Sequence, residues 1–290
     1  MIIVRLKGGF GNQLFQYATA RRLAAANDTE VLIDLSYLNK DSNGAYTQRK
    51  FELDQIKIKA GIASEDELVR FNVSGLLDKV KNKLGIGQYL TLYEAASLGP
   101  LQLKALKGNY LLDGYWQDER YFIEMRKELL DEIQPVYAFT NWGEELKKMI
   151  LATNSVALHV RRGDYVSLKH ANEFHGTCSL EYYRNAIDEL KRKCNGLSYF
   201  IFSDDVDWCR KELSFLPEAV FVVNESEKKS SQDLFLMSLC RHNVIANSSY
   251  SWWAAWLNQN PNKTVISPVK WFKDVNQDTS NLIPKNWIRI

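Results

Sequence analysis

The sequence predicts an α/β protein whose two halves are each organised around a parallel sheet. In the carboxyl-terminal half, short apolar runs alternate with helix-like stretches, which is typical of a sheet with crossover helices. The amino-terminal half begins in the same way, with an apolar strand, a glycine-rich turn and a helix. A length of 290 residues with 46% hydrophobic residues suffices for one large domain or two ordinary ones with their own cores.

The amino-terminal half starts with a strand over residues 2–6 and passes through Gly8, Gly9 and Gly11 into a helix with Leu14, Ala18 and Ala25 on one side. Glycines let the backbone turn sharply and approach a ligand, while the start of a helix offers unpaired N–H groups to an anion. The turn lacks the Gly-Lys-Ser/Thr ending of a P-loop and the full dinucleotide fingerprint. The turn alone therefore does not define a nucleotide site.

The rest of this half is less regular. Strands are expected at 31–34 and 109–113, whereas residues 55–107 show no strong period. A helical link near 117–150 joins the two halves, which gives expected domains of 1–150 and 151–290.

The carboxyl-terminal half contains five expected strands, at 156–160, 198–202, 219–223, 243–246 and 264–266. Ser179 is placed to cap a helix that Asn195-Gly196 ends, and this helix covers one face of the sheet. In open parallel sheets, ligands bind beyond the carboxyl ends of the strands. Arg161, Asp204 and Asn247 all follow expected strands, so we expect them at one edge.

The stretch from His159 to Tyr165 places two arginines, a histidine and an aspartate at the end of an apolar strand. Side chains alternate along a strand, so His159 and Arg161 should project to the face opposite Leu158 and Val160. Guanidinium groups stay charged and offer a planar fork that suits a phosphate. A purely structural Arg–Asp pair is the alternative.

Composition excludes several classes of protein. Lys and Arg exceed Asp and Glu by 37 to 35, so the overall charge gives no case for nucleic-acid binding. The amino terminus does not read as a signal peptide, and no apolar run approaches a membrane span, which favours a cytoplasmic protein. The basic spacing of Lys79, Lys81 and Lys83 fits peripheral contact with the inner membrane, but also an ordinary solvated face. The spacing of the four cysteines indicates reduced packing thiols.

Taken together, several motifs resemble the α-1,2-fucosyltransferases of glycosyltransferase family 11, over most of the chain outside residues 40–107. The motifs are Gly8 to Ala18, Gly114-Tyr115-Trp116-Gln117, His159 to Tyr165, Phe202 to Asp205 with Trp208-Cys209, and Ala246 to Leu257.

The resemblance implies a GT-B fold, in which two Rossmann-like domains face each other across a cleft. It implies that domain 151–290 binds GDP-fucose, that domain 1–150 lies on the acceptor side, and that the carboxyl-terminal tail can pack back on the first domain. The implied reaction inverts the anomeric carbon of GDP-β-L-fucose and makes an α-1,2 bond to the 2-hydroxyl of a terminal galactose. The partners would be GDP-fucose and a galactoside, lipid-linked or soluble.

The resemblance also suggests donor-site residues in the second domain. By analogy with other fucosyltransferases, Arg161 would bind the β-phosphate, and His159 would contact guanine or the diphosphate unless it is simply a core histidine. Asp233 would accept two N–H bonds from guanine, although a helix cap is the alternative. Ser248 and Ser249 suit a diphosphate, or a helix cap.

Three assignments concern the reaction itself. Asp164 is the candidate general base unless it is locked to Arg162, with Glu173 and His175 as alternatives; a reaction without a dedicated base, as in some related fucosyltransferases, is a further alternative. Asn12 and Gln13 of the opposing domain would close over the fucose or diphosphate and exclude water.

No metal and no other cofactor is expected, because Arg161 would take the metal's role. Asp205-Val206-Asp207 matches the Asp-x-Asp pattern of metal-dependent glycosyltransferases, but it falls in a stretch that the family does not associate with metal. Two rival functions remain: a GDP-fucose transferase that makes an α-1,6 or peptide linkage, and a non-catalytic module that binds a nucleotide sugar or a glycan.

Overall fold

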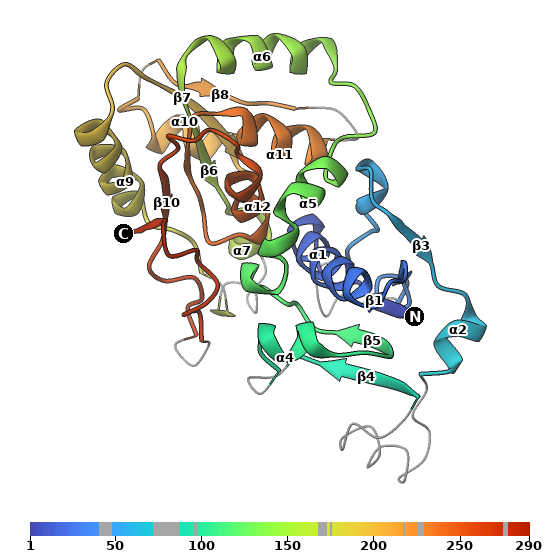
Figure 1. Ribbon diagram of the computed structural model, residues 1–290. Helices are drawn as coiled ribbons and strands as arrows, with labels where there is room; N and C mark the ends of the chain where they lie inside the picture. Colours follow the sequence, from blue (N-terminus) through green and yellow to red (C-terminus); the bar gives the residue numbers. More distant parts are fainter. Residues whose placement is uncertain are drawn as a thin grey trace. The chain divides into compact units, whose positions relative to one another are not determined.

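A computed structural model describes residues 1–40, 48–71, 88–94, 98–167, 173–174, 176–216, 218–224, 229–274 and 278–290, without the side chains of Asp164 and Lys229. The chain divides into two compact units, Met1–Val136 and Tyr137–Ile290 (Figure 1). The division falls earlier than the expected boundary at residue 150. Helix α6 (Asn141–Ala152), expected in the link, belongs to the second unit and packs there against β6 and α11.

The first unit is built on a five-stranded sheet in which every pairing is parallel, with strand order β3-β2-β1-β5-β4. Its strands are β1 (Ile2–Arg5), β2 (Val31–Asp34), β3 (Ala60–Ile62), β4 (Tyr89–Tyr93) and β5 (Asn109–Asp113). Its helices are α1 (Phe10–Ala26), α2 (Glu65–Val69), α4 (Pro100–Ala105) and α5 (Arg126–Glu132), with 3-10 turns at Leu53–Gln55, Glu119–Tyr121 and Ile123–Met125. The three strands expected at 2–6, 31–34 and 109–113 are confirmed.

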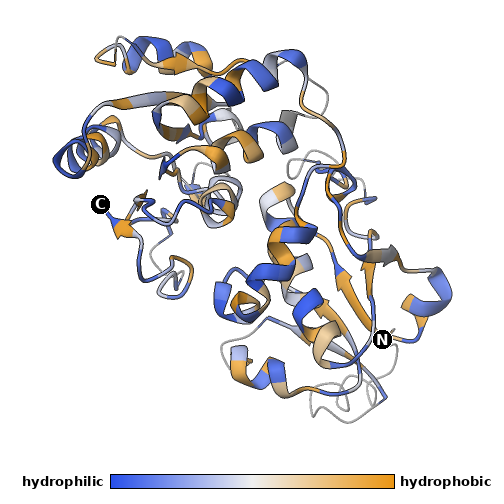
Figure 2. Ribbon diagram, turned by 45° about the horizontal axis from the view of Figure 1, so that its top comes forward, coloured by the Kyte–Doolittle hydropathy of each residue, from blue (hydrophilic) through white to orange (hydrophobic). Residues whose placement is uncertain are grey.

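Apolar residues concentrate in the strands of this unit, and the exposed sides of its helices are more hydrophilic (Figure 2). Helix α1 is buried over most of its length and contacts β1 and β2. It begins after Gly8, whose φ of +72° lies in the left-handed region that glycine adopts readily. The expected strand, turn and helix are therefore all present.

The second unit has a six-stranded parallel sheet of order β11-β10-β9-β6-β7-β8. Its strands are β6 (Asn154–Val160), β7 (Leu197–Ser203), β8 (Val220–Phe221), β9 (His242–Val244), β10 (Val265–Ser267) and β11 (Ile288–Arg289). Besides α6, its helices are α7 (Gly163–Ser167), α9 (Leu180–Lys193), α10 (Val206–Glu212), α11 (Lys229–Leu239) and α12 (Ser249–Leu257). Numbered within the unit, this is the Rossmann order 3-2-1-4-5-6, whose switch point lies between β6 and β9.

All five strands expected in this half are confirmed, and β11 is an addition to them. The end of the chain pairs as β11 with β10 of the same sheet. The carboxyl-terminal tail thus contributes a strand to the second unit.

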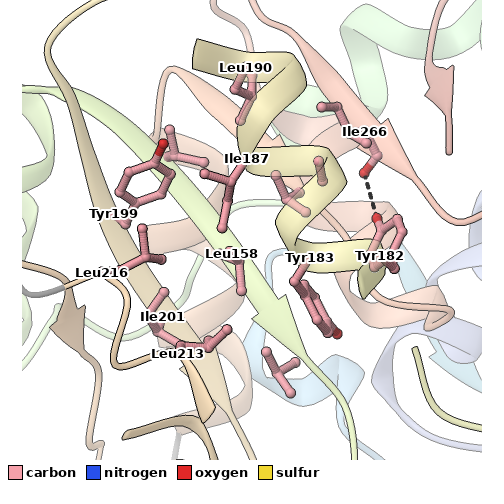
Figure 3. Packing of buried hydrophobic residues seen from close by; sticks show 14 of the residues in the cluster. Leu158, Tyr182, Tyr183, Ile187, Leu190, Tyr199, Ile201, Leu213, Leu216 and Ile266 are labelled. Atoms are coloured by element: carbon pink, nitrogen blue, oxygen red, sulfur yellow. Dashed lines mark hydrogen bonds between the residues drawn. The ribbon is translucent and has the colours of Figure 1, made fainter. Parts of the chain in front are cut away.

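Helix α9 covers the sheet face that carries Leu158 and Val160, and it forms one core with α10 and the following loop. Ser179 caps α9 by accepting a hydrogen bond from the backbone N–H of Tyr182 at 3.1 Å, and Gly196 follows its end at φ +64°. Figure 3 shows this core, with the hydroxyl of Tyr182 directed at the carbonyl of Ile266. The predicted cap and the predicted helix end are both confirmed.

Helices α11 and α12 pack against each other, and in Figure 1 α9 and α11 lie on opposite sides of β6 and β7. The side chains of Trp252, Trp253 and Trp256 on α12 are almost entirely buried. Their rings contact one another at centroid distances of 5.0–6.4 Å. Aromatic contacts of this kind add to the burial of apolar area in stabilising a core.

None of the four cysteines is in a disulfide, as the sequence predicts. Within the described ranges, we find no helix that combines the length and apolar character needed to cross a membrane.

Candidate active site

A cluster of polar and charged residues lies where β6, β7 and β9 end. Strands β6 and β7 are in register with Val160 beside Ser203, so the residues that follow each strand meet. Arg161 Nη1 lies 2.8 Å from Asp204 Oδ2, and each of these side chains is about one-quarter exposed. The expectation that Arg161 and Asp204 share the carboxyl edge of the sheet is confirmed.

Gly163 makes this pair possible. A Cβ atom at Gly163 would lie 2.6 Å from Asp204 Oδ2, closer than real Cβ contacts come. Any other residue at this position would require the Asp204 carboxylate or the backbone at residue 163 to shift.

Arg162 is held in place by different contacts. Its backbone N–H donates to Asp204 Oδ1 at 2.8 Å, and its Nε donates to Asp205 Oδ2 at 3.0 Å. Its guanidinium lies over the ring of Trp208, 4.2 Å from the centroid. Arg162 thus fixes the loop by pairing with the carboxylate of Asp205.

Asp205 is also the first residue of the Asp-x-Asp pattern. Its Oδ1 accepts the backbone N–H of Trp208 at 3.1 Å and so caps α10, while its Oδ2 pairs with Arg162. Both oxygens therefore already have partners. Among the residues that the structure describes, no three His, Cys, Asp or Glu side chains form a group that could hold a metal ion.

His159 lies on β6, two residues before Arg161, and is only 6% exposed. Its ring centroid is 5.7 Å from that of Tyr250 on α12, so it projects to the face opposite α9, as expected. Burial lowers the pKa of His159 from 6.5 to about 4, with Asp204 opposing and Arg161 reinforcing this effect. The imidazole is therefore neutral at pH 7, and its buried Nδ1 has no hydrogen-bond partner among the residues that the structure describes.

The turn after β9 borders the same edge. Asn247 is almost fully buried, and its Nδ2 donates to the carbonyls of Gly176 at 3.2 Å and Trp271 at 3.1 Å. Ser248 occupies the N-cap position of α12, yet its side chain makes no capping hydrogen bond. Ser249 begins α12 soon after β9, and β9 is the neighbour of β6 in the sheet. The backbone amides in the first turn of α12 suit an anion.

The remaining expected site residues of this unit are less well defined. Asp233 lies in the first half of α11, where its Oδ1 accepts a hydrogen bond from Asn224 Nδ2 at 2.8 Å. Glu173 is exposed. The side chain of Asp164 and the whole of His175 lie outside the described residues, as do Lys79, Lys81 and Lys83.

In the first unit, Gln13 is buried and its amide is fully engaged by backbone groups. Its Nε2 donates to the carbonyls of Gly8 at 2.9 Å and Lys50 at 2.8 Å, and its Oε1 accepts the N–H of Glu52 at 3.0 Å. Gln13 therefore holds the glycine-rich turn against residues 50–52, and its contact with the donor stays a prediction. Asn12 is half-buried, and its Oδ1 accepts from Gln117 Nε2 at 2.7 Å.

Sequence reasoning missed a second charged cluster, at the carboxyl ends of β1, β2 and β5. Arg5 binds Asp34 through Nε and Asp113 through Nη1, both at 2.7 Å. Lys7 also pairs with Asp113, and its ammonium lies 5.2 Å from the ring centroid of Tyr37. The available signal was a charged residue at the end of each expected strand.

Comparison of folds adds to this geometry. The chain resembles the crystal structure of the NodZ α-1,6-fucosyltransferase soaked with GDP-fucose, with a TM-score of 0.53, 15% identity, and coverage of 88% of this chain and 92% of that one. Two units that are each built on a parallel sheet, the second in Rossmann order, together with this likeness define a glycosyltransferase fold of the GT-B class.

Sequence comparison places the protein within that class. The model of "Glycosyl transferase family 11" matches residues 93–290. An α-1,2-colitosyltransferase of Escherichia coli is 32% identical over 100% of this chain and 99% of its own length. The O-antigen biosynthesis glycosyltransferase WbnK of E. coli is 36% identical over 98% and 99%. A galactoside 2-α-L-fucosyltransferase, SEC1 of Bos taurus, is 26% identical over 54% and 44%. The protein belongs to glycosyltransferase family 11.

Proposed function

We propose that the protein transfers L-fucose from GDP-β-L-fucose to the 2-hydroxyl of a terminal galactose, with inversion of the anomeric carbon. The observation that carries the proposal is Arg161, which is held by Asp204 and follows β6, one of the two strands that border the switch point of a Rossmann sheet, where a nucleotide ligand is expected. The α-1,2 linkage in the name of one relative and the galactoside 2-α-L-fucosyl activity in the name of another support the linkage and the acceptor. The O-antigen relative supports a lipid-linked or soluble glycan as acceptor.

Arg161 is proposed to bind the β-phosphate. A guanidinium has five N–H donors in a planar fork, and Asp204 engages Arg161 through Nη1. The donors that Asp204 does not use can bind phosphate oxygens, and their charge stabilises the diphosphate as it leaves. Asp204 is then a positioning residue that sets the plane of the fork. The Ser248 hydroxyl and the amides at the start of α12 would bind the diphosphate from the adjacent strand end.

The same arrangement supports a reaction without a metal. Arg161 supplies the positive charge that the leaving diphosphate needs, and the two oxygens of Asp205 are held by Arg162 and the N–H of Trp208. A metal at the Asp-x-Asp pattern would have to displace both partners.

For the other residues we propose the roles that the sequence analysis suggested. Asp233 would recognise guanine, and the unpartnered Nδ1 of the neutral His159 would bind guanine or the diphosphate. Asp164 stays the proposed base that accepts the proton of the attacking hydroxyl. Asn12 of the first unit would close over the donor.

Transfer of colitose is a second candidate, because the α-1,2-colitosyltransferase matches this chain from end to end. Colitose is fucose without its 3-hydroxyl. The two donors therefore differ by one hydroxyl, and a site that hydrogen-bonds this group would discriminate strongly between them.

The test is acceptor-dependent release of GDP from GDP-fucose, with lactose or N-acetyllactosamine as acceptor, in EDTA, and with the product linkage read by NMR. We expect an α-1,2-fucosylated galactose. An α-1,6 product, or no turnover with GDP-fucose but turnover with GDP-colitose, would contradict the proposed reaction. Loss of activity in EDTA that manganese restores would contradict the metal-free mechanism alone.

Arg161→Ala tests the role of the arginine in the same assay. We expect kcat/KM to fall at least a hundredfold, in the range found when a donor to a developing anion is removed, about 10²–10³. Arg192→Ala is the matched control, because Arg192 is an exposed arginine on α9 that pairs only with nearby Glu189 among the described contacts. Substantial turnover in Arg161→Ala would remove this residue from the mechanism.

A further inference from the structure

The first unit contains a cavity of about 430 Å³ at the carboxyl ends of β1, β2 and β4. Arg5, Asp34, Ser36 and Thr91 form its polar wall, and Phe71 and Tyr93 contribute aromatic surface. Its volume lies in the range of small-molecule sites, roughly 300–1,000 Å³. None of these residues belongs to the proposed donor site.

The lining of this cavity carries no excess of positive charge. Among the lining residues, Arg5 is positive and is paired with Asp34 at 2.7 Å. Glu65, a further carboxylate, also lines the cavity. The cavity of the first unit therefore has no surplus positive charge with which to attract a phosphate or a carboxylate.

The polar wall is firmly built. The Asp34 side chain has no exposed surface, and besides Arg5 it accepts the backbone N–H of Ser36 at 2.8 Å. Asp34 thus holds the Arg5 guanidinium and the backbone of Ser36 in place from below. The Arg5 guanidinium, the Ser36 hydroxyl and the Glu65 carboxylate form a set of donors and acceptors at the cavity. Sugar hydroxyls, which both donate and accept, match such a set.

The aromatic wall has the complementary property. Tyr93, which lines the cavity, is 60% exposed, so much of its surface is open to a ligand. Phe71 packs with Ile3 and Leu111 in the core beneath the cavity. The C–H face of a hexose ring is apolar, and aromatic rings supply large, rigid surface against which it can lie.

We propose that this cavity binds the uncharged terminal hexose of the acceptor glycan, with Arg5, Ser36 and Glu65 on its hydroxyls and Tyr93 against its ring. The identification of the hexose as the acceptor rests on the proposed function. The lack of surplus positive charge in its lining gives the site a specificity: a neutral galactoside binds, and a sugar acid of the same ring does not.

The experiment measures binding directly, by saturation-transfer NMR titration of the whole protein with methyl β-D-galactopyranoside and with methyl β-D-galactopyranosiduronate, which differs by a carboxylate at C6. We expect the galactoside to bind at least tenfold more tightly than the uronate. Tyr93→Ala should weaken galactoside binding about tenfold, equivalent to about 1.4 kcal/mol, and Ser36→Ala should weaken it to a smaller extent. GDP binding should be unchanged in both variants.

Leu101→Ala is the control, because Leu101 on α4 is 78% exposed and lies outside the cavity lining. Tyr93 is exposed as well, so neither truncation threatens the fold. Equal galactoside binding by Tyr93→Ala and wild type, equal binding of the two sugars, or no galactoside binding by wild type would each overturn the inference.

The two proposals fail separately. Binding that depends on Tyr93, without fucosyl transfer, keeps the sugar site and contradicts the proposed donor or reaction. Fucosyl transfer to lactose with an acceptor KM unchanged by Tyr93→Ala keeps the proposed function and overturns the sugar site.

Discussion

The buried imidazole of His159 predicts a measurable loss of stability in acid. Its pKa is about 4 in the folded protein and about 6.5 when exposed, because burial disfavours the charged form. Between these values the unfolded chain binds a proton that the folded protein does not. The free energy of unfolding is therefore highest above pH 6.5 and falls as the pH decreases to 4. At about 1.4 kcal/mol per pKa unit, the full loss is about 3 kcal/mol.

The measurement is urea denaturation of wild type and His159→Asn at a series of pH values from 7.5 to 4. Carboxylates and His242, whose pKa is also lowered by burial, titrate in both proteins and cancel in the difference. We expect the two curves of unfolding free energy to converge by about 3 kcal/mol as the pH falls from 6.5 to 4. Parallel curves over this interval, whatever their separation at pH 7, would refute the assignment of a neutral buried imidazole.

Two further substitutions test named contacts. Gly163→Ala should lower kcat/KM by about a hundredfold, because the new Cβ displaces Asp204 and with it the fork of Arg161, while thermal unfolding changes little; activity close to wild type would show that Asp204 does not position the arginine. Tyr17→Phe should destabilise the protein by about 1–3 kcal/mol, because the Tyr17 hydroxyl donates to the buried Glu132 at 2.6 Å and accepts the N–H of Lys59 at 2.9 Å; an unchanged urea midpoint would contradict that value.

The strands found from sequence are those with continuous apolar runs. Of the strands that were missed, β4 has the apolar sequence Tyr-Leu-Thr-Leu-Tyr within a stretch without a strong period, whereas β3 and β11 lack the signal. β3 spans Ala60–Ile62, contains a glycine and is largely exposed, and β11 pairs through only Ile288 and Arg289. Edge strands of this kind bury little apolar surface, so their periodicity is weak. The expected boundary at residue 150 missed that α6 buries Leu146 and Ile150 and packs within the second unit.

The position of the candidate site could be predicted because parallel strands end at one edge, which brings Arg161, Asp204 and Asn247 together. The partners could not be predicted. Whether an arginine binds Asp204 or Asp205 depends on the register of β6 and β7 and on the space that Gly163 leaves. The environment of Gln13 likewise depends on residues 50–52, which lie far from it in sequence. The charged ends of β1, β2 and β5 were visible, but their convergence requires the strand order.

Two neighbouring tyrosines of α9 affect how much order the proposed donor, GDP-fucose, would have to impose on binding. The Tyr182 hydroxyl lies 2.6 Å from the carbonyl of Ile245 and 3.2 Å from that of Ile266, and the Tyr183 hydroxyl donates to the carbonyl of His159 at 3.2 Å. One helix thus ties together the ends of β6, β9 and β10 before any ligand arrives. Because the backbone at these strand ends is already fixed, binding costs little backbone entropy. The entropy lost on binding should therefore come mainly from side chains and from the nucleotide sugar itself.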